Sequence, residues 1–458
     1  MAATIRRRMA IHEIFIGKLF LIAGEFCCQG TYRHQGRWLI VVTARVRYIC
    51  VRHLREREDM EIKYKLISAD SHVAFDRDAF TSRMSGAKWE DRIPQVVEVR
   101  HDGHSVDRWS VYGIPAGDTI CNCPALMGDP FPTYPQHWEE VPRTAFDPLE
   151  RLKALDRDRV DAEVLFPNPP GGTFFEFGDA KFELTVVQAY NDVLSDWARA
   201  SDRYVPLAIL PYLSEPTTIA REIARAAAAG HRGINCLGET PKGLPHLCDP
   251  RWYPVWNVCQ ELELPVHIHG SAGLRAGASV RKWEGYTPRQ AHSAMTATSA
   301  VTPAQVVPQL IFSGITERFP KLKFVFAEAG MGGLNYVIAA CDHEWECRRL
   351  WTEGISTRPS EVVRRQMYVN FWFEMEGIKL RHDIGIDNIM WESDFPHVAS
   401  YYPRSWDEVE RVLAGVPAED RRKILYENAT RVYRIEANIT EESVGSSHHL
   451  ASEAGNAA

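Results

Sequence analysis

Acidic and imidazole side chains stand at the ends of several apolar, strand-like stretches of this sequence. The first stretch, 65–72, ends on Asp70 and His72, two residues apart. Because residues i and i+2 of an extended chain face the same side, both side chains can point at one site just beyond a strand end. The plainer interpretation is a strand followed by a polar turn, since Asp and Ser both favour turns.

Three later stretches carry the same kinds of side chain at their C-terminal ends. They are 265–269 with His267 and His269, 323–328 with Glu328, and 388–394 with Asp394. Core packing requires apolar residues at such positions, so four polar strand ends predict a site. Carboxylate and imidazole ligands suit Zn²⁺, Mn²⁺ or Fe²⁺. Such an ion would lower the pKa of a bound water or polarise a substrate oxygen.

The strand-like stretches alternate with helix-like segments from residue 64 onward. This alternation is typical of successive βα units and a parallel sheet. Eight units predict an α/β fold of the TIM (β/α)8 barrel type, with its active site at the C-terminal strand ends. The predicted strands are 64–69, 162–166, 205–210, 233–236, 265–269, 323–327, 367–371 and 388–391.

The segments between these strands show helical periodicity or are long loops. Two connections are too long for ordinary loops, 76–143 after the first strand and 270–302 after the fifth, and such loops at a catalytic rim form lids or substrate walls. The predicted helices are 149–157, 182–200, 216–229, 252–261, 304–319, 333–350 and 374–384, followed by closing helices at 405–414 and 418–434.

The two ends of the chain differ from the barrel sequence. Residues 1–59 are basic, rich in Arg and without a coherent amphipathic period, so we expect an N-terminal extension outside the fold, upstream of a biological start at Met60. A genuine targeting arm is the alternative. The barrel domain is expected at 60–437. The tail 438–458 lacks apolar residues and is expected to be disordered.

Composition and net charge limit the kinds of molecule that this protein is expected to bind. The formal net charge of −7 and a pI near 6.2 argue against nucleic acid and against an anionic membrane, because both require a basic surface. No stretch approaches the roughly 18 apolar residues that cross a bilayer. Ten scattered cysteines without Cys-x-x-Cys spacing indicate the reduced thiols of a cytoplasmic protein. A small-molecule substrate is expected, and a homo-oligomer is left open.

An ordered series of motifs gives the sequence a family resemblance that spans about 65–433. The clearest motifs are 67–73 (ISADSHV), 161–167 (DAEVLFP), 264–270 (LPVHIHG) and 393–397 (SDFPH). The series resembles the amidohydrolase-related family of the amidohydrolase superfamily, which includes the aminocarboxymuconate-semialdehyde decarboxylase-like enzymes. The resemblance implies a metal-dependent (β/α)8 barrel.

Carried over by position, the resemblance implies a set of metal ligands. The first-strand His-x-His of the family becomes Asp70-Ser-His72, the fifth-strand ligand matches His269, and the eighth-strand acid matches Asp394, which would also move a proton. We therefore expect one divalent ion, with Zn²⁺ favoured and Mn²⁺ or Fe²⁺ as alternatives.

Other polar residues are open to more than one interpretation. Glu328 stands where many members of the family have a catalytic His, and it is expected to be catalytic, although backbone amides of the turn 330–333 could also bind its carboxylate. His267 is expected to hydrogen-bond inside the barrel rather than contact substrate. His397 is expected to orient a ligand, contact substrate or belong to a plain loop. Glu392 is expected to face outward.

The favoured function is hydrolysis of a C–N or C–O bond in a small, planar or aromatic substrate. The first alternative is nonoxidative decarboxylation of a carboxylated ring or dienoate, because the same parts would then hold a substrate oxygen while Asp394 delivers a proton to carbon. The second alternative is a barrel that binds a metal or ligand without catalysis. Aromatic residues near the rim suit a planar substrate, although they could equally pack the loops; they include Phe174, Phe175, Phe177, Trp283 and Tyr286.

Overall fold

The computed structural model of the protein describes residues 25–34, 37–45, 60–101, 103–117, 119–270, 285, 287–297 and 301–438. It divides into two units, Met1–Val51 and Arg52–Ala458. In the first unit, β1 (Glu25–His34) and β2 (Arg37–Arg45) form an antiparallel hairpin. The expected disordered tail lies outside the described residues from position 439 onward, as does most of the N-terminal extension. Among the described residues, no helix is long and apolar enough to cross a membrane.

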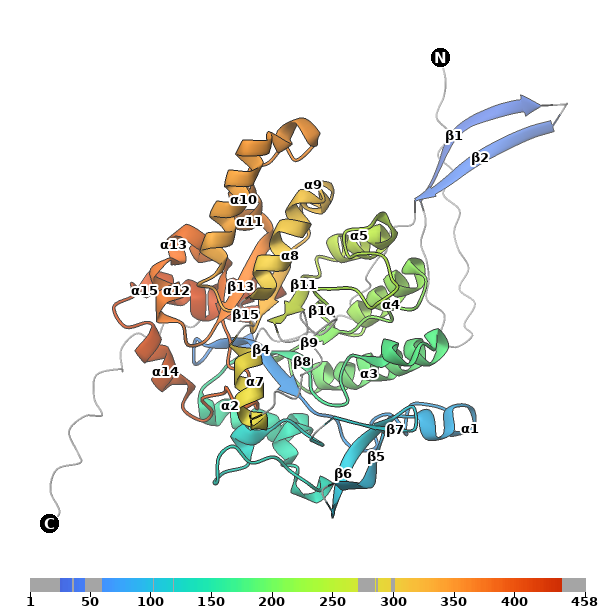
Figure 1. The fold of residues 1–458 in the computed structure, drawn as a ribbon. Helices are drawn as coiled ribbons and strands as arrows, with labels where there is room; N and C mark the ends of the chain where they lie inside the picture. Colours follow the sequence, from blue (N-terminus) through green and yellow to red (C-terminus); the bar gives the residue numbers. More distant parts are fainter. Residues whose placement is uncertain are drawn as a thin grey trace, which may run out of the picture. The chain divides into compact units, whose positions relative to one another are not determined.

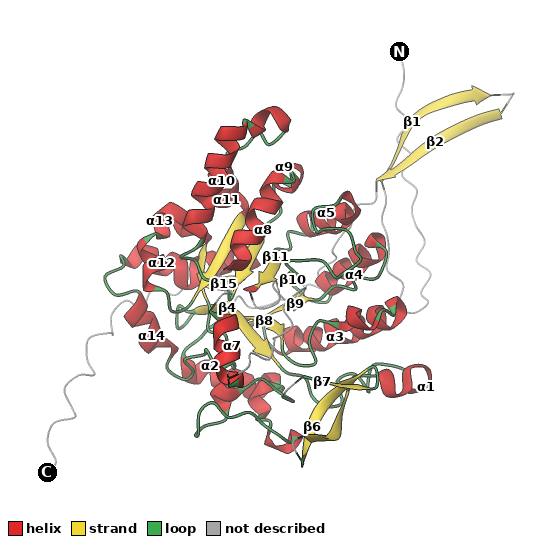
Figure 2. Ribbon diagram, viewed as in Figure 1, coloured by secondary structure: helices red, strands yellow, loops and turns green. Residues whose placement is uncertain are grey.

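The second unit is a (β/α)8 barrel, as predicted from the sequence. Eight parallel strands form one sheet in the order β14-β13-β12-β11-β10-β9-β8-β4, with helices on its outside (Figures 1 and 2). A bridge between Ser71 and Phe395 joins the first strand to the end of the last. The strands are β4 (Ile67–Val73), β8 (Ala162–Pro167), β9 (Tyr204–Ala208), β10 (Gly233–Cys236), β11 (Val266–His269), β12 (Phe324–Ala327), β13 (Met367–Phe371) and β14 (Ile389–Trp391).

Helices cover the barrel, and the first two of the larger ones begin at aspartate caps. Asp147 accepts hydrogen bonds from the amides of Leu149 and Glu150 at the start of the first of them, and Asp179 caps the next in the same way. The larger helices are α2 (Pro148–Asp158), α3 (Ala180–Ala200), α4 (Pro216–Ala228), α5 (Tyr253–Glu261), α8 (Val301–Phe312), α10 (Leu334–Arg348), α11 (Pro359–Gln366) and α14 (Ser405–Val412).

Several predicted boundaries differ from the structure. The segment 304–319 is divided into α8 and α9 (Ile315–Arg318), 374–384 into α12 (Met375–Lys379) and α13 (Arg381–Ile384), and 418–434 into α15 (Ala418–Arg422), a π-helical turn and α16 (Asn428–Tyr433). Helix α11 was not predicted. A short parallel pair, β3 (Met60–Glu61) with β15 (Ala437–Asn438), joins the two ends of the barrel sequence.

Both long loops contain secondary structure that was not predicted. The first contains α1 (Gly86–Trp89) and an antiparallel sheet of β5 (Gln95–His101), β6 (His104–Val111) and β7 (Ile114–Ala116). The second contains α7 (Pro288–Thr296). Two of the predicted rim aromatics pack against the first of these loops: Phe174 is buried and contacts Phe80, and Phe177 stacks on Tyr112. Trp283 and Tyr286 lie outside the described residues.

The largest correction concerns the first barrel strand. It was predicted to end at Ala69, but β4 continues to Val73, so Asp70 and His72 lie within the strand. Between Ser68 and Ser71 the strand has one residue more than its partner β8, because these two serines pair with Glu163 and Leu165. Such a bulge re-aims side chains and is frequent beside active sites. Asp70 is one of the two residues that form it.

Candidate metal centre

The predicted site residues meet inside the barrel at the C-terminal ends of four strands. Asp70 and His72 come from β4, His269 is the last residue of β11, Glu328 follows β12 directly, and Asp394 follows β14. Asp70, His72, His269 and Asp394 are all buried. The four strand ends that were singled out in the sequence therefore form one site.

Asp70, His72 and His269 make up the first of two overlapping groups. Asp70 lies between the two imidazoles, with Oδ1 3.3 Å from His72 Nε2 and Oδ2 3.3 Å from His269 Nε2. The two Nε2 atoms are 3.4 Å apart. The potential ligand atoms of the three residues lie within 4.8 Å of one another, which is close enough to hold one ion.

The second group shares His72 and adds Glu328, Asp394 and His397, again with potential ligand atoms within 4.8 Å. Asp394 Oδ1 lies 3.3 Å from His72 Nε2 and 2.9 Å from His397 Nδ1. The rings of His72 and His397 stack with their centroids 3.8 Å apart. His397 therefore lies beside Asp394 in the site, as expected for a residue that orients a ligand.

The imidazole of His72 is oriented for metal binding. Its Nδ1 lies 2.7 Å from the carbonyl oxygen of Pro167, so Nδ1 carries the proton and donates to that oxygen. Nε2 then faces Asp70 and Asp394. Burial lowers the pKa of His72, but the charges of these two residues outweigh it and raise that pKa, and Nε2 would offer its lone pair to an ion that displaces its proton. Metal-binding histidines are commonly fixed in this way by a hydrogen bond from the other ring nitrogen.

A divalent cation fits this set of donors. Both carboxylate oxygens of Asp70 are buried without a geometrically suitable hydrogen-bond donor among the described residues. Buried carboxylates without partners are unstable unless a cation neutralises them. Carboxylate and imidazole donors without a thiolate suit a first-row divalent metal ion.

Electrostatic coupling shifts the pKa values of the cluster. Burial lowers the pKa of His269, but Glu328 and Asp70 outweigh it and raise that pKa to about 9. Burial, followed by the charge of Asp394, raises the pKa of Glu328 to about 8. Burial works to raise the pKa of Asp394, yet His397 and His72 bring it well below its usual range. His269 and Glu328 therefore hold protons near neutral pH, and a cation bound at the site would compete with these protons.

Glu328 does not take the purely structural position considered for it. Its Oε2 lies 3.5 Å from His269 Nδ1, on the ring edge opposite Asp70. In the turn 330–333, the Met331 amide donates instead to Glu374, at 3.0 Å. Glu328 is therefore placed either to orient His269 or to reach the ion itself.

Glu392 was predicted to face outward, and this prediction is wrong. Its side chain is completely buried, and both carboxylate oxygens lie within hydrogen-bonding distance of the Glu328 amide, at 3.2 and 3.1 Å. The sequence contained a signal for this position, because Glu392 stands two residues before Asp394 and shares its face in an extended chain.

His267 lies deeper in the barrel and is engaged on both sides. Nδ1 is 3.0 Å from the carbonyl oxygen of Ile234, and Nε2 is 3.0 Å from the hydroxyl of Tyr433. Burial lowers the pKa of His267 to about 3, so the ring is neutral. This agrees with the favoured interpretation of a hydrogen-bonded interior imidazole.

Three buried serines between β4 and β14 were missed by the sequence analysis. Ser68 Oγ lies 2.9 Å from Ser393 Oγ and donates to the carbonyl oxygen of Asp70 at 2.7 Å, while Ser71 Oγ lies 3.1 Å from both other hydroxyls. The amide of Ser393 donates to Ser68 Oγ at 3.0 Å. The cluster supports the bulge that carries Asp70 and binds it to the segment that carries Asp394.

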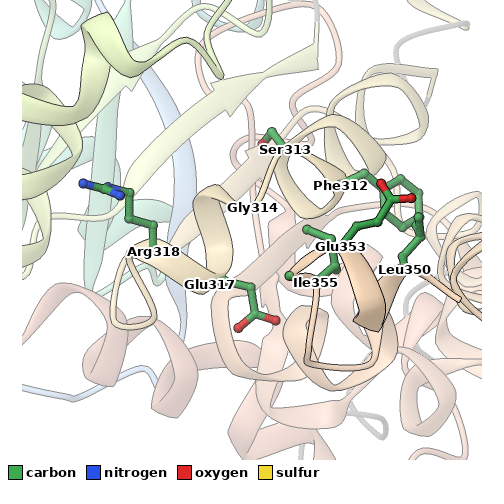
Figure 3. Close-up of a pocket in the computed structure, with 9 residues that line it drawn as sticks. Phe312, Ser313, Gly314, Glu317, Arg318, Leu350, Glu353 and Ile355 are labelled. Atoms are coloured by element: carbon green, nitrogen blue, oxygen red, sulfur yellow. The ribbon is translucent and has the colours of Figure 1, made fainter.

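A separate surface pocket of about 450 Å³ lies away from these residues (Figure 3). It is lined by the end of α8, by α9 and by the segment between α10 and α11, including Ser313, Glu317, Arg318 and Glu353. These segments lead into the N-terminal ends of β12 and β13, so the pocket belongs to the barrel face opposite the metal centre.

The barrel and its ligand cluster define a metal-dependent enzyme of the amidohydrolase superfamily. The model of the amidohydrolase family matches residues 92–435, and the chain belongs to this family. Its relatives include the gamma-resorcylate decarboxylase of Rhodococcus jostii (strain RHA1), 24% identical over 325 residues that cover 66% of this chain and 92% of the relative.

Two further matches are to another decarboxylase and to a solved structure. The 2-amino-3-carboxymuconate-6-semialdehyde decarboxylase of Dictyostelium discoideum is 26% identical over 234 residues, which cover 50% of this chain and 60% of the relative. The crystal structure of an amidohydrolase from Mycobacterium avium subsp. paratuberculosis K-10 has a TM-score of 0.64 at 20% identity, covering 81% of this chain and 98% of the other. The structural match supports the fold.

Proposed function

We propose that this protein is a metal-dependent decarboxylase that removes a carboxylate group, without oxidation, from a small carboxylated ring or dienoate. The observation that carries the proposal is that both relatives described above are named decarboxylases, one of them matched over 92% of its length. Hydrolysis of a C–N or C–O bond was the reaction favoured from the sequence, whereas the relatives favour its decarboxylation alternative.

The proposed metal ligands are Asp70, His72, His269 and Asp394. A divalent ion bound there would supply positive charge that holds a substrate oxygen and stabilises negative charge during the reaction. Zn²⁺ is the favoured ion, and Mn²⁺ and Fe²⁺, which also accept nitrogen and oxygen donors, are the alternatives.

The remaining chemistry falls to side chains of the chain itself. Decarboxylation breaks a carbon–carbon bond, releases carbon dioxide and leaves an electron pair on the substrate carbon, which must then receive a proton. Asp394 is proposed to move this proton, and His397, 2.9 Å away, to share it. Glu328 is proposed to orient His269 from the opposite edge of the ring.

The proposal is tested by release of carbon dioxide or bicarbonate. Metal-loaded protein is incubated with 2,6-dihydroxybenzoate, other hydroxybenzoates and aminocarboxymuconate-like acids, and in parallel with lactones and amides. We expect release from a carboxylated substrate that stops with a chelator and returns with added metal. Turnover of a lactone or amide without such release would instead establish hydrolysis, and binding without any turnover would indicate a noncatalytic barrel.

A further inference from the structure

A buried arginine spans the seam where the first and last strands close the barrel. Arg151 lies on α2 and is completely buried. Its guanidinium makes a bidentate ion pair with Glu163 of β8, with Nε to Oε1 and Nη2 to Oε2 both 2.9 Å. Both side chains are fully removed from solvent. The pair is therefore held in one fixed geometry.

The same guanidinium reaches backbone on both sides of the seam. Nη2 lies 3.2 Å from the carbonyl oxygen of His72 on β4 and 3.2 Å from that of Phe395 beyond β14. The Phe395 oxygen also accepts the His72 amide, at 2.7 Å. The Phe395 ring lies against the guanidinium, with Cζ 4.0 Å from its centroid. One contact is thus on a proposed ligand, and the other is on the residue after Asp394.

Stability alone does not account for this ion pair. Removing two charges from water costs about as much as their attraction returns, and apolar replacements of buried pairs are often neutral or stabilising. Arg151 Nη1 is in addition buried without a hydrogen-bond partner among the described residues. What the arginine does supply is a planar fork whose donors lie at fixed separations.

We propose that Arg151, held by Glu163, is a positioning residue that keeps His72 and Asp394 at metal-binding separation across the barrel seam. The inference rests on the proposed metal site. His72 Nε2 and Asp394 Oδ1 are 3.3 Å apart although they come from opposite ends of the barrel sequence. A small shift between the two strands would separate them, and the contacts of Arg151 oppose that shift.

The test is Mn²⁺ affinity, measured by titration calorimetry at low temperature on the metal-free full chain. Arg151→Met is expected to weaken Mn²⁺ binding by about 10- to 100-fold, the usual effect of losing an outer partner of a ligand. Arg151→Lys keeps the charge without the fork and should lie between this variant and the wild type. Thermal unfolding is recorded for every variant.

Arg225→Met is the matched control. Arg225 makes a bidentate pair with Glu222 on α4, with both contacts at 2.8 Å, and touches none of the proposed ligands. It should lower the unfolding temperature without changing Mn²⁺ affinity. An equal loss of affinity in this control would reduce the role of Arg151 to general stability and overturn the inference.

If Arg151→Met does not fold, two milder variants replace it in the test. Arg151→Lys and Glu163→Gln should both weaken Mn²⁺ binding at a temperature where their circular dichroism equals that of the wild type. Wild-type affinity in both overturns the positioning role and leaves the metal site standing. A wild-type chain that binds none of Mn²⁺, Zn²⁺ and Fe²⁺ overturns the metal site itself, and this inference with it.

Discussion

Glu328 and Asp394 share an uncommon backbone conformation. Their φ angles are +48° and +50°, in the left-handed region, and each residue lies just beyond the end of a barrel strand. Residues other than glycine adopt this region at a cost in free energy, and the residues that do so gather at functional sites. Nine described non-glycine residues have a positive φ, and these two of them lie at the candidate site.

Asp394→Asn should separate metal binding from proton transfer. Asparagine tolerates the left-handed conformation, so the backbone is preserved, and its amide oxygen can still approach an ion. It cannot carry a proton, so turnover should fall by about 10²- to 10⁴-fold while metal content falls much less. Turnover is measured beside the metal-to-protein ratio from elemental analysis. A proportional fall in both would make Asp394 a ligand only.

Glu328→Gln should stabilise the metal-free protein. Asp70, Glu328 and Asp394 bring three carboxylates to one buried site, where they repel one another unless a cation neutralises them. Burial and this repulsion keep a proton on Glu328 near neutral pH, because its pKa is about 8, whereas the unfolded chain releases that proton. Glutamine is neutral in both states, so the substitution should raise the unfolding temperature after chelation and reduce the further gain from added Mn²⁺. The two temperatures are compared by calorimetry. Unchanged apo stability, metal affinity and activity would exclude a site role for Glu328.

His231 should make the fold sensitive to acid. It is buried between α4 and β10, its Nδ1 lies 3.1 Å from the Ala226 carbonyl oxygen, and burial lowers its pKa to about 4. The unfolded chain takes up this proton near pH 6.5 and the folded chain only near pH 4, so stability is complete above pH 6.5 and falls as the pH decreases toward 4. The contribution is about 3 kcal/mol.

His231→Asn removes this titration and keeps a donor for the Ala226 carbonyl. Urea unfolding between pH 4 and 7 should therefore show a flatter pH dependence in the variant. An identical slope in both proteins would mean that His231 has the same pKa in the folded and the unfolded state, so that burial does not shift it.

At the scale of the elements, the side chains of His267 on β11 and Leu207 on β9 occupy the space that a side chain at Gly233 of β10 would need. A Cβ atom there would lie 2.7 Å from His267 Cε1 and 2.8 Å from Leu207 Cδ2. Gly233→Ala should thus lower the free energy of unfolding by about 1 to 3 kcal/mol, the usual cost of overpacking. Gly86→Ala, where a Cβ meets no atom within 4 Å, is the control and should change little.

The eight barrel strands could be predicted because strands buried on both faces read as apolar runs. The C-terminal end of β4 could not be predicted, because Asp70 and His72 are polar residues of the kind that is common in turns. They lie in the strand because the candidate site requires polar side chains there. The serine cluster could not be predicted either: Ser68 and Ser393 are 325 residues apart, and no local pattern joins them.

The sequence of the first long loop contains a pattern that predicts its antiparallel sheet. Val97 and Val99 alternate with Glu98 and Arg100, and Asp102-Gly103, a common hairpin turn, separates this stretch from the next. These strands lie between two barrel strands, outside the βα alternation, so the pattern that predicts the barrel does not predict them.

At the scale of the whole molecule, we expect the barrel to be independent of residues 1–59. A chain that begins at Met60 keeps β3 and its pairing with β15. It should have the same unfolding temperature and turnover as the full chain, measured by calorimetry and by the decarboxylation assay. A large fall in unfolding temperature would show that the extension contributes to the fold.

The seam between β4 and β14 has a consequence for synthesis in the cell. The ribosome makes Ser68 and Ser393 325 residues apart, roughly 20 to 60 s at ordinary elongation rates. During that time Asp70 and His72 have been synthesised but Asp394 has not, and β4 lacks β14, the strand that closes the barrel. A nascent chain stalled before β14 should consequently retain little metal, so ion loading would report the moment at which the last strand is released and the ring closes.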